Sequence, residues 1–503
     1  MNLRLQDDAR TDTGCDHSEP TFVTLRELSS CLKSKHIGRP DFKANPLRER
    51  QWRDVYDHAT NVATAQTAPR SELLELDTAE RRRMMRRAVV SSAAGTTIEW
   101  YDFFLYGVAA ALVFPQKFFP GSDPYVATLL AFSTYFVGFV ARPVGAALFG
   151  HYGDRIGRKA TLIATLVLMG GATIGIGLVP DYNSIGIWGA VLLTFFRVLQ
   201  GIGVGGEWGG AVLIAGEWTD PKRRGFTTSF AQFGAPAGMV LANGALAVTS
   251  LVTSEATFLN WAWRVPFLLS LALVFVGLYI RTGVLETPVF AKLRSQGRVA
   301  RTPVAQVLRH HWPEVVLTAL LRSGQQTPFY IFTTYVLTYA TQQLGFDRSL
   351  ILSFVMIQAL VSMAAIPYFG HLSDVIGRRK ITAIGCIVML VFPFVYFGML
   401  DTHIVWLVFI AITLGLPSQD LQYGPQAAFI AERFPGTLRY SGASLGYQLA
   451  SITAGGPAPI VALYLFQTFH TSMAVAAYVA VTALISLVCV WLLPDRQDSL
   501  DHK

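Results

Sequence analysis

Two short charged strings, 220 residues apart, interrupt long apolar stretches of this chain: GHYGDRIGRK (150–159) and GHLSDVIGRR (370–379). Each string opens with glycine and continues with an acid four residues later, a second glycine and a basic pair. Glycine permits a tight turn between two helices, and basic pairs are typical of loops on the cytoplasmic side of a membrane. The repetition therefore predicts a duplicated helical membrane protein.

The composition agrees with this interpretation. Of 503 residues, 52% are hydrophobic and only 15% are charged, which is too apolar for an ordinary soluble enzyme. The formal net charge of +8 comes from short clusters in loops, so membrane topology explains it better than nucleic-acid binding. The four cysteines are scattered without CxxC spacing, and we expect neither a disulfide framework nor a metal site.

Twelve apolar runs are long enough to cross a bilayer, which takes about 20 helical residues. They cover residues 88–114, 124–150, 160–180, 185–216, 225–252, 261–281, 313–343, 348–370, 381–400, 404–431, 440–466 and 471–493. Lysine and arginine concentrate in alternate connections, and cytoplasmic loops carry this excess. Both chain termini are therefore predicted to be cytoplasmic.

The spans divide six and six around a long polar connection. The predicted parts are an N-terminal bundle at 85–281, a cytoplasmic central loop at 282–312, a C-terminal bundle at 313–494 and a tail at 495–503. Residues 1–84 are polar and lack an apolar run of membrane length. We expect a disordered leader or a mis-assigned start, with Met84 or Met85 as initiator, and the alternative is a regulatory segment.

A second pair of related strings supports the duplication. AGEWTDPKRRG (215–225) follows the fourth span and AERFPGTLRYSG (431–442) follows the tenth, which places Glu217 and Glu432 at similar points of the two halves. Internal repeats are a recurring construction of secondary transporters, whose substrate site lies near the membrane midplane where the halves meet.

Over residues 85–495 the chain resembles the major facilitator superfamily, through the two loop strings. Its metabolite:proton symporter branch, which includes carriers of shikimate, 2-oxoglutarate, citrate and proline/betaine, is indicated by five further strings: IEWYDFFLYG (98–107), ARPVGA (141–146), RVLQGIGVGGEWGGA (197–211), WRVPF (263–267) and LETPVF (285–290). The resemblance implies an all-α fold of twelve transmembrane helices, in two six-helix bundles related by pseudo-two-fold symmetry.

The resemblance also implies a cytoplasmic gate. In this family Asp154 with Arg158, and Asp374 with Arg378, would hold the helix ends together while the carrier is open to the outside. An acid near a helix N-terminus is favoured by about 0.3–1 kcal/mol, which agrees with that role. We also assign Glu217, Glu432 and Arg142 to this gate, with a purely structural role as the alternative for Arg142.

Acidic residues inside the first span predict proton coupling. Glu99 and Asp102 are three residues apart, hence on one helical face. Because an ionised side chain at the bilayer centre costs about 2.5–3.5 kcal/mol, both acids should face a cavity, where an acid binds a proton more readily. Asp102 is the preferred proton carrier, and the alternative is that one acid only pairs with a structural arginine.

The fourth span offers a complementary charge. Arg197, Gln200 and Glu207 fall within one sector of the helix and should line the cavity, with Arg197 and Gln200 as candidate substrate ligands. Guanidinium binds a carboxylate bidentately, so Arg197 is a candidate anchor for an anionic metabolite, and Glu207 is a third candidate for proton coupling. The alternative is an internal ion pair between Arg197 and Asp102 or Glu207.

The opposite wall of the substrate site is predicted in the second half. Arg322, Gln326 and Tyr330 follow one another at i+4 steps in the seventh span, and Asp420 lies in the tenth. All four are candidate substrate ligands.

The sequence thus predicts a secondary transporter of a bacterial-type inner membrane. It would import a small carboxylated or zwitterionic metabolite together with protons, and we expect a monomer. The proton gradient would supply the free energy without a cofactor, because no phosphate-binding loop for ATP is present. The alternatives are an efflux antiporter of the same fold and a membrane sensor that binds the metabolite without moving it. No catalytic constellation is visible, so we do not expect an enzyme.

Overall fold

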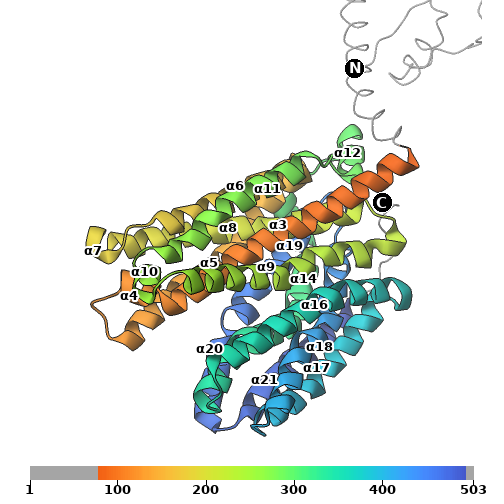
Figure 1. Cartoon of the computed structure of the whole chain (residues 1–503). Coiled ribbons are helices and arrows are strands. Elements are labelled where there is room, and N and C mark those ends of the chain that lie inside the picture. Colours follow the sequence, from red (N-terminus) through yellow and green to blue (C-terminus); the bar gives the residue numbers. More distant parts are fainter. Residues whose placement is uncertain (1–76, 494–503) are drawn as a thin grey trace, which may run out of the picture. The chain divides into compact units, whose positions relative to one another are not determined.

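The computed structural model describes residues 77–493, and in this part of the chain every regular element is a helix (Figure 1). Six long helices form the first bundle: α3 (Thr78–Leu112), α5 (Pro124–Arg155), α6 (Arg158–Leu178), α8 (Trp188–Glu217), α9 (Arg224–Val252) and α11 (Val265–Thr282). Short helices connect some of them, namely α4 (Phe114–Phe118), α7 (Tyr182–Ile185), η1 (Pro221–Arg223), α10 (Glu255–Asn260) and η2 (Ala262–Arg264).

The second bundle also contains six long helical segments. Four are single helices: α16 (Arg348–Ile376), α17 (Arg378–Leu400), α18 (Val405–Ala431) and α21 (Ser472–Leu492). The other two are interrupted by π-helical turns: α14 (Trp312–Tyr330) continues through η3 (Ile331–Tyr335), α15 (Val336–Thr338) and η4 (Tyr339–Gln343), and α19 (Arg439–Ala450) continues through η5 (Ser451–Gly455) to α20 (Ala458–Phe469). Such turns are frequent at functional sites.

Ten of the helical segments in the described residues are long and apolar enough to cross a membrane. The helices α3 and α14 complete the twelve. Their hydropathy is lower because α3 carries Glu99 and Asp102, and α14 carries Arg322, Gln325 and Gln326. The predicted all-helical fold is therefore confirmed, and the two spans outside the ten both carry candidate site residues.

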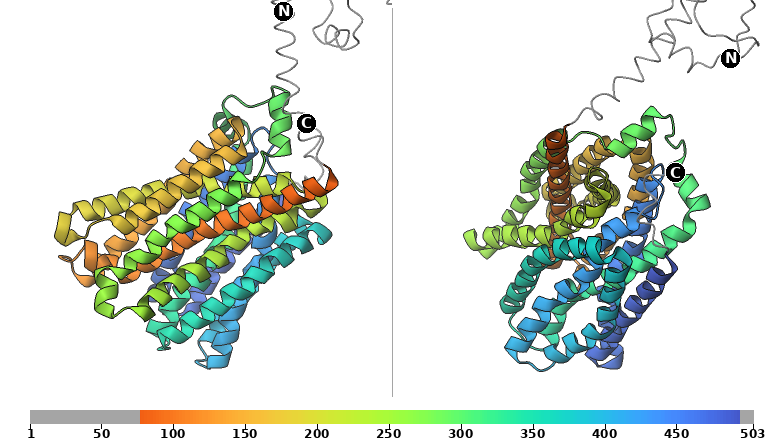
Figure 2. Two further views of the ribbon diagram at one scale, coloured as in Figure 1. Left: turned by 45° about the horizontal axis from the view of Figure 1, so that its top comes forward. Right: turned by 90° about the vertical axis from the view of Figure 1, so that its right-hand side faces the viewer.

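The two bundles occupy separate halves of the helical region (Figure 2). Between them α9 packs on α16 and α5 packs on α19, so the second long helix of each bundle meets the fifth long helix of the other. We call the end of the bundles that carries residues 150–159 and 370–379 the gate side. The predicted central loop contains two short helices, α12 (Pro288–Ser295) and α13 (Pro303–His310).

The first long helix begins earlier than predicted. Asp77 and Glu80 form a capping box, in which the Asp77 carboxylate accepts the backbone N–H of Glu80 at 2.7 Å. Residues 78–84 of the predicted leader are therefore helical. Residues 1–76 of the leader and the predicted tail at 495–503 lie outside the described residues.

Candidate functional site

A buried hydrogen-bond network connects four helices of the first bundle. The Asp102 carboxylate of α3 is fully buried and accepts the hydroxyls of Thr173 in α6 at 2.7 Å and Ser270 in α11 at 2.6 Å. Gln200 of α8 donates to the Thr173 hydroxyl at 2.8 Å and accepts from Arg197. The structure thus joins the predicted proton carrier to the predicted substrate anchor through neutral side chains, and the described residues contain no direct ion pair between them.

Aromatic rings surround the Arg197 guanidinium. Its Cζ lies 5.1, 4.3 and 4.7 Å from the ring centroids of Phe103, Tyr106 and Tyr135. Such cation–π contacts stabilise a cation that has no carboxylate beside it. Space for this side chain comes from Gly138 of α5, because a Cβ there would overlap the guanidinium.

Glu207 lies in a different environment from Arg197 and Gln200. It forms a buried ion pair with Arg281 of α11 and accepts the Thr165 hydroxyl at 2.7 Å. Arg281 also donates to the backbone carbonyl of Leu162. Arg281 was not predicted as a site residue, because it is the last residue of the sixth apolar run and resembles a loop charge.

The second bundle has a network of similar construction. The Asp420 carboxylate of α18 is fully buried and accepts the hydroxyl of Ser362 in α16 at 2.6 Å and the amide of Gln419 at 2.8 Å. Gln419 in turn accepts from Gln325 of α14 at 2.8 Å, and Gln325 lies 3.5 Å from the Arg322 guanidinium. Asp420 is therefore two glutamine side chains away from Arg322, so this predicted substrate ligand belongs to the interior of the bundle.

Arg322 also reaches the interface between the bundles. It donates to Gln326 and to Gln426 of α18, both at 3.1 Å. Its Cζ lies 3.1 Å from the ring centroid of Tyr447 in α19, and the ring of Trp208 in α8 stacks on Tyr447 with 3.5 Å between the centroids. Tyr447 and Trp208 were not predicted, because nothing in the sequence pairs residues from the fourth and eleventh spans.

Arg142 is the predicted gate residue that the structure places elsewhere. Its Cζ lies 4.6 Å from the ring centroids of both Phe103 and Phe139. The ring of Tyr330 packs on Phe139, with 5.8 Å between the two centroids. The reason is that α5 continues to Arg155, so Arg142 is about 20 Å from the helix end at 1.5 Å per residue. Arg142 therefore belongs to the central region.

Glu99 is the central acid with an unused oxygen. The residue is buried, and its Oε2 has no hydrogen-bond partner within residues 77–493. Its charged neighbours are Glu207, Arg142, Arg322 and Arg281. A buried polar atom without a partner is costly, so Glu99 is positioned to meet a ligand or water.

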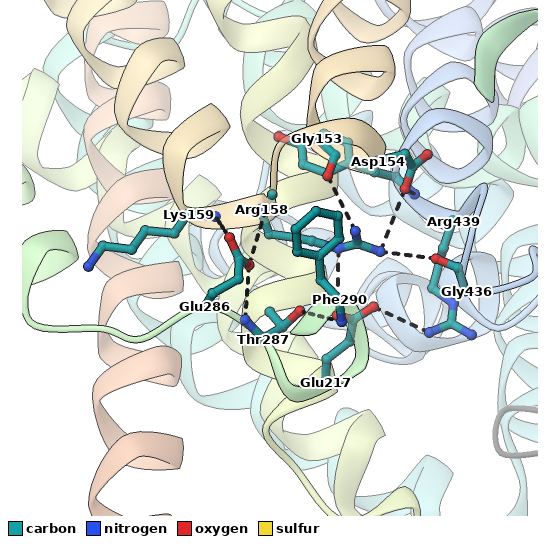
Figure 3. Close-up of polar contacts among 12 residues, drawn as sticks. Gly153, Asp154, Arg158, Lys159, Glu217, Glu286, Thr287, Phe290, Gly436 and Arg439 are labelled. Carbon is teal, nitrogen blue, oxygen red and sulfur yellow. Dashed lines mark hydrogen bonds and ion pairs between the residues drawn. The ribbon is translucent and has the colours of Figure 1, made fainter. Parts of the chain in front are cut away.

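On the gate side, the first loop string closes on the opposite bundle. The Asp154 carboxylate accepts the backbone N–H groups of Tyr440 at 3.2 Å and Ser441 at 2.9 Å, at the start of α19. Arg158 lies 3.6 Å from both Asp154 and Glu217 (Figure 3). We call Asp154, Arg158 and Glu217 the first gate cluster. An anion at a helix N-terminus meets free N–H groups and the positive end of the helix dipole.

Residues of α12, the segment before α19 and the start of α19 contact the first gate cluster. Arg439 donates to Glu217 at 3.3 Å, and Arg158 donates to the carbonyl of Gly436 at 3.0 Å (Figure 3). The ring centroid of Phe290 in α12 lies 4.8 Å from the Cζ of Arg158. Central-loop contacts of this kind were not predicted.

Glu286 is a gate residue that the sequence analysis did not assign. Its carboxylate accepts the backbone N–H groups of Arg158 at 3.1 Å and Lys159 at 3.3 Å, so it caps α6 (Figure 3). Gly157 precedes these residues with φ 125°, and a Cβ there would overlap Glu286. The LETPVF string, which indicated the symporter branch, contains Glu286 and could have pointed to this residue.

The second gate cluster consists of Asp374, Arg378 and Glu432. Asp374 accepts the backbone N–H groups of Gly225 and Phe226 at the start of α9, both at 2.8 Å. Arg378 lies 3.4 Å from Asp374 and 2.9 Å from Glu432. Burial raises the pKa of Glu432, although the Arg378 charge acts in the opposite direction. Six of the seven predicted gate residues thus form two clusters of three, one in each bundle, and the aspartate of each cluster binds backbone N–H groups of the opposite bundle.

Comparison with known proteins gives consistent matches. The sequence model of the Major Facilitator Superfamily matches residues 92–456. The chain is 41% identical over 420 residues to the inner membrane metabolite transport protein YhjE of Escherichia coli K12, and 39% identical over 416 residues to its shikimate transporter, each match covering 82% of this chain and 95% of the relative. It is 32% identical over 416 residues to the proline/betaine transporter of the same organism, covering 80% of this chain and 82% of that protein.

Solved structures agree in fold. The proton:xylose symporter XylE bound to 6-bromo-6-deoxy-D-glucose superposes with a TM-score of 0.66 at 17% identity, covering 82% of this chain and 97% of that one.

Proposed function

We propose that this chain, which belongs to the major facilitator superfamily and is a membrane transporter of metabolites, imports a small carboxylated or zwitterionic metabolite together with protons. The cargo would cross the bacterial inner membrane by alternating access of a central site to the two sides. The proton gradient would supply the free energy.

The observation that carries the proposal is the network from Asp102 to Arg197. An isolated carboxylate in a membrane interior is costly, and Asp102 receives only neutral donors, so this environment favours the protonated acid. The Thr173 hydroxyl has a second acceptor, the Met169 carbonyl at 3.0 Å. When Asp102 holds a proton, Thr173 can turn to that carbonyl, which changes the bond from Gln200 and frees Arg197.

The charges of the central region favour an anionic group on the cargo. Arg142, Arg197 and Arg322 are buried there, and none of them has a carboxylate in ion-pair contact within the described residues. A carboxylate suits the planar guanidinium. The free oxygen of Glu99 would accept a cationic group, which accommodates a zwitterion. The named relatives include both kinds of carrier, for shikimate and for proline/betaine.

The gate clusters define the state of the structure under this proposal. Both clusters join helix ends of opposite bundles, so the gate side is closed. Basic residues concentrate in its loops, which would place it in the cytoplasm together with both chain termini. The structure then corresponds to a carrier that is closed to the cytoplasm.

Reconstituted protein tests the proposal. Proteoliposomes with an inward proton gradient and a panel of labelled organic acids and betaines should accumulate one of them, and a protonophore should abolish the accumulation. Asp102→Asn should lose gradient-driven accumulation but retain exchange of substrate across the membrane.

The matched control is Asp347→Asn, which makes the same chemical change at an exposed helix cap where asparagine serves equally well. Accumulation by the Asp102 variant at the wild-type level would remove Asp102 from coupling. Wild-type accumulation that resists a protonophore would sink proton symport.

A further inference from the structure

Asp420 is a buried acid with neutral partners, and binding of the cargo does not explain why an acid lies there. It is fully buried in α18, and its two oxygens accept from the neutral groups of Ser362 and Gln419. The packed helices α9, α14, α16 and α17 place no charged side chain in ion-pair contact with it within the described residues. The nearest charge along its network is Arg322, which it reaches only through Gln419 and Gln325.

The same arrangement surrounds Asp102 in the first bundle. Each aspartate is fully buried, accepts one serine hydroxyl at 2.6 Å and connects to an arginine through two neutral side chains, the second of which is a glutamine of that arginine's own helix. In the first bundle the acid lies in the first helix of its half and the arginine in the fourth. In the second bundle these positions are exchanged, since Arg322 lies in the first helix of its half and Asp420 in the fourth.

We propose that Asp420 is a second proton-binding carboxyl, so that each bundle carries one proton in every transport cycle. This inference rests on the proposed function above. An O–H bond forms on Asp420 with a proton from the outer water, and it breaks when the site opens to the cytoplasm and releases that proton to water. The protonated state is neutral, which removes the cost of burying a charge among neutral partners.

The alternative is that Asp420 only holds α16 and α18 together by hydrogen bonds. Both roles use the contact with Ser362, so loss of stability cannot separate them. Asparagine keeps the shape and an acceptor oxygen but cannot be ionised. A test must therefore follow the carboxyl proton itself.

Infrared difference spectroscopy of the purified full chain, with a pH step as the only probe, follows that proton directly. Between roughly pH 5 and 9, where perturbed carboxyls titrate, the wild-type protein should show C=O bands of protonated carboxyls that appear and disappear. Asp420→Asn should lose one band that Asp102→Asn retains. A spectrum of Asp420→Asn identical to wild type would overturn the proposal.

Ser362→Ala is the second variant, to be measured if Asp420→Asn does not fold. It leaves the carboxyl in place and removes one hydrogen bond, so the Asp420 band should move in frequency rather than vanish. Unchanged bands in this variant would count against Asp420 as the titrating group. Both spectra are obtained without substrate, so they decide about Asp420 even if the proposed symport fails.

The number of protons transported per substrate molecule completes the test. It is measured as the accumulation of labelled shikimate, the probe, by proteoliposomes. With the membrane potential held at zero, a one-unit pH gradient supports about 100-fold accumulation for two protons and about tenfold for one. The wild type should approach the first value and Asp420→Asn the second. A wild-type ratio of one proton would overturn the second site while leaving proton symport intact.

Discussion

The two gate clusters differ in what covers them, although both come from the same repeated string. The central loop covers the first gate cluster, where Phe290 faces Arg158 and Glu286 caps the adjoining helix. At the second gate cluster, a Cβ on Gly377 would meet nothing within 4 Å, whereas a Cβ on Gly157 would overlap Glu286.

The arginines of the two clusters also divide their contacts differently. Arg158 lies 3.6 Å from each of its two acids and gains a carbonyl and an aromatic ring, whereas Arg378 lies 2.9 Å from Glu432. The repeated string therefore determines the turn and the acid that meets the opposite helix end. The strength of each cluster depends on residues outside the repeat, and this difference can be tested.

Removal of the gate carboxylates should have the largest effect. Asp154→Asn loses the charge at the α19 terminus and leaves Arg158 fully buried with only a 3.6 Å contact to an acid. Hydrogen bonds to charged groups are worth about 1.5–3 kcal/mol each, so the closed state should weaken by on the order of 3 kcal/mol. Asp374→Asn should cost less, because Arg378 keeps Glu432 at 2.9 Å.

Distances between spin labels on the gate side measure this effect. Ile156 and Val375 are exposed on opposite bundles and accept labels on introduced cysteines, in a background without the native cysteines. The open population should rise more for Asp154→Asn than for Asp374→Asn and should not change for Asp347→Asn. Equal populations for the two gate variants would show that the 2.9 Å contact of Arg378 with Glu432 does not offset the loss of the Asp374 charge.

Alanine at the two turn glycines should give the next largest effect. Gly157 and Gly377 have φ of 125° and 106°, and a non-glycine residue there costs about 1–3 kcal/mol. Gly157→Ala should lower the thermal unfolding midpoint in detergent further than Gly377→Ala, because its Cβ must also displace Glu286. If both variants unfold at the same temperature, the Glu286 side chain moves aside without loss of stability, and the different surroundings of the two glycines do not affect stability.

Loss of the Glu286 charge should give the smallest effect. Glu286→Gln keeps the side-chain length but removes the anion from the α6 terminus, which is worth about 0.3–1 kcal/mol. A fall of a few degrees or less in the unfolding midpoint is expected, and it should shrink in high salt. Glu255→Gln, at an exposed helix start on the other side, is the control for a general loss of acid. A salt-insensitive change would point to packing rather than charge.

The sequence by itself determined the fold and the ends of the gate. Apolar length, turn glycines and loop charges are local properties, and they report directly on membrane spans and on the connections between them. The duplication could be recognised for the same reason. It placed Asp154, Arg158, Asp374 and Arg378 at corresponding helix ends, and the structure shows both pairs there.

Only the tertiary structure decided the partners of the buried charges. Glu207 shares a helix with Arg197 but pairs with Arg281, 74 residues further along the chain, and Arg142 lies among central aromatic rings instead of at the gate. Helical periodicity states which side chains share a face, but it does not state which other helix packs against that face. That choice is made by the packing of twelve helices, and it decided which neutral side chains connect each buried aspartate to an arginine.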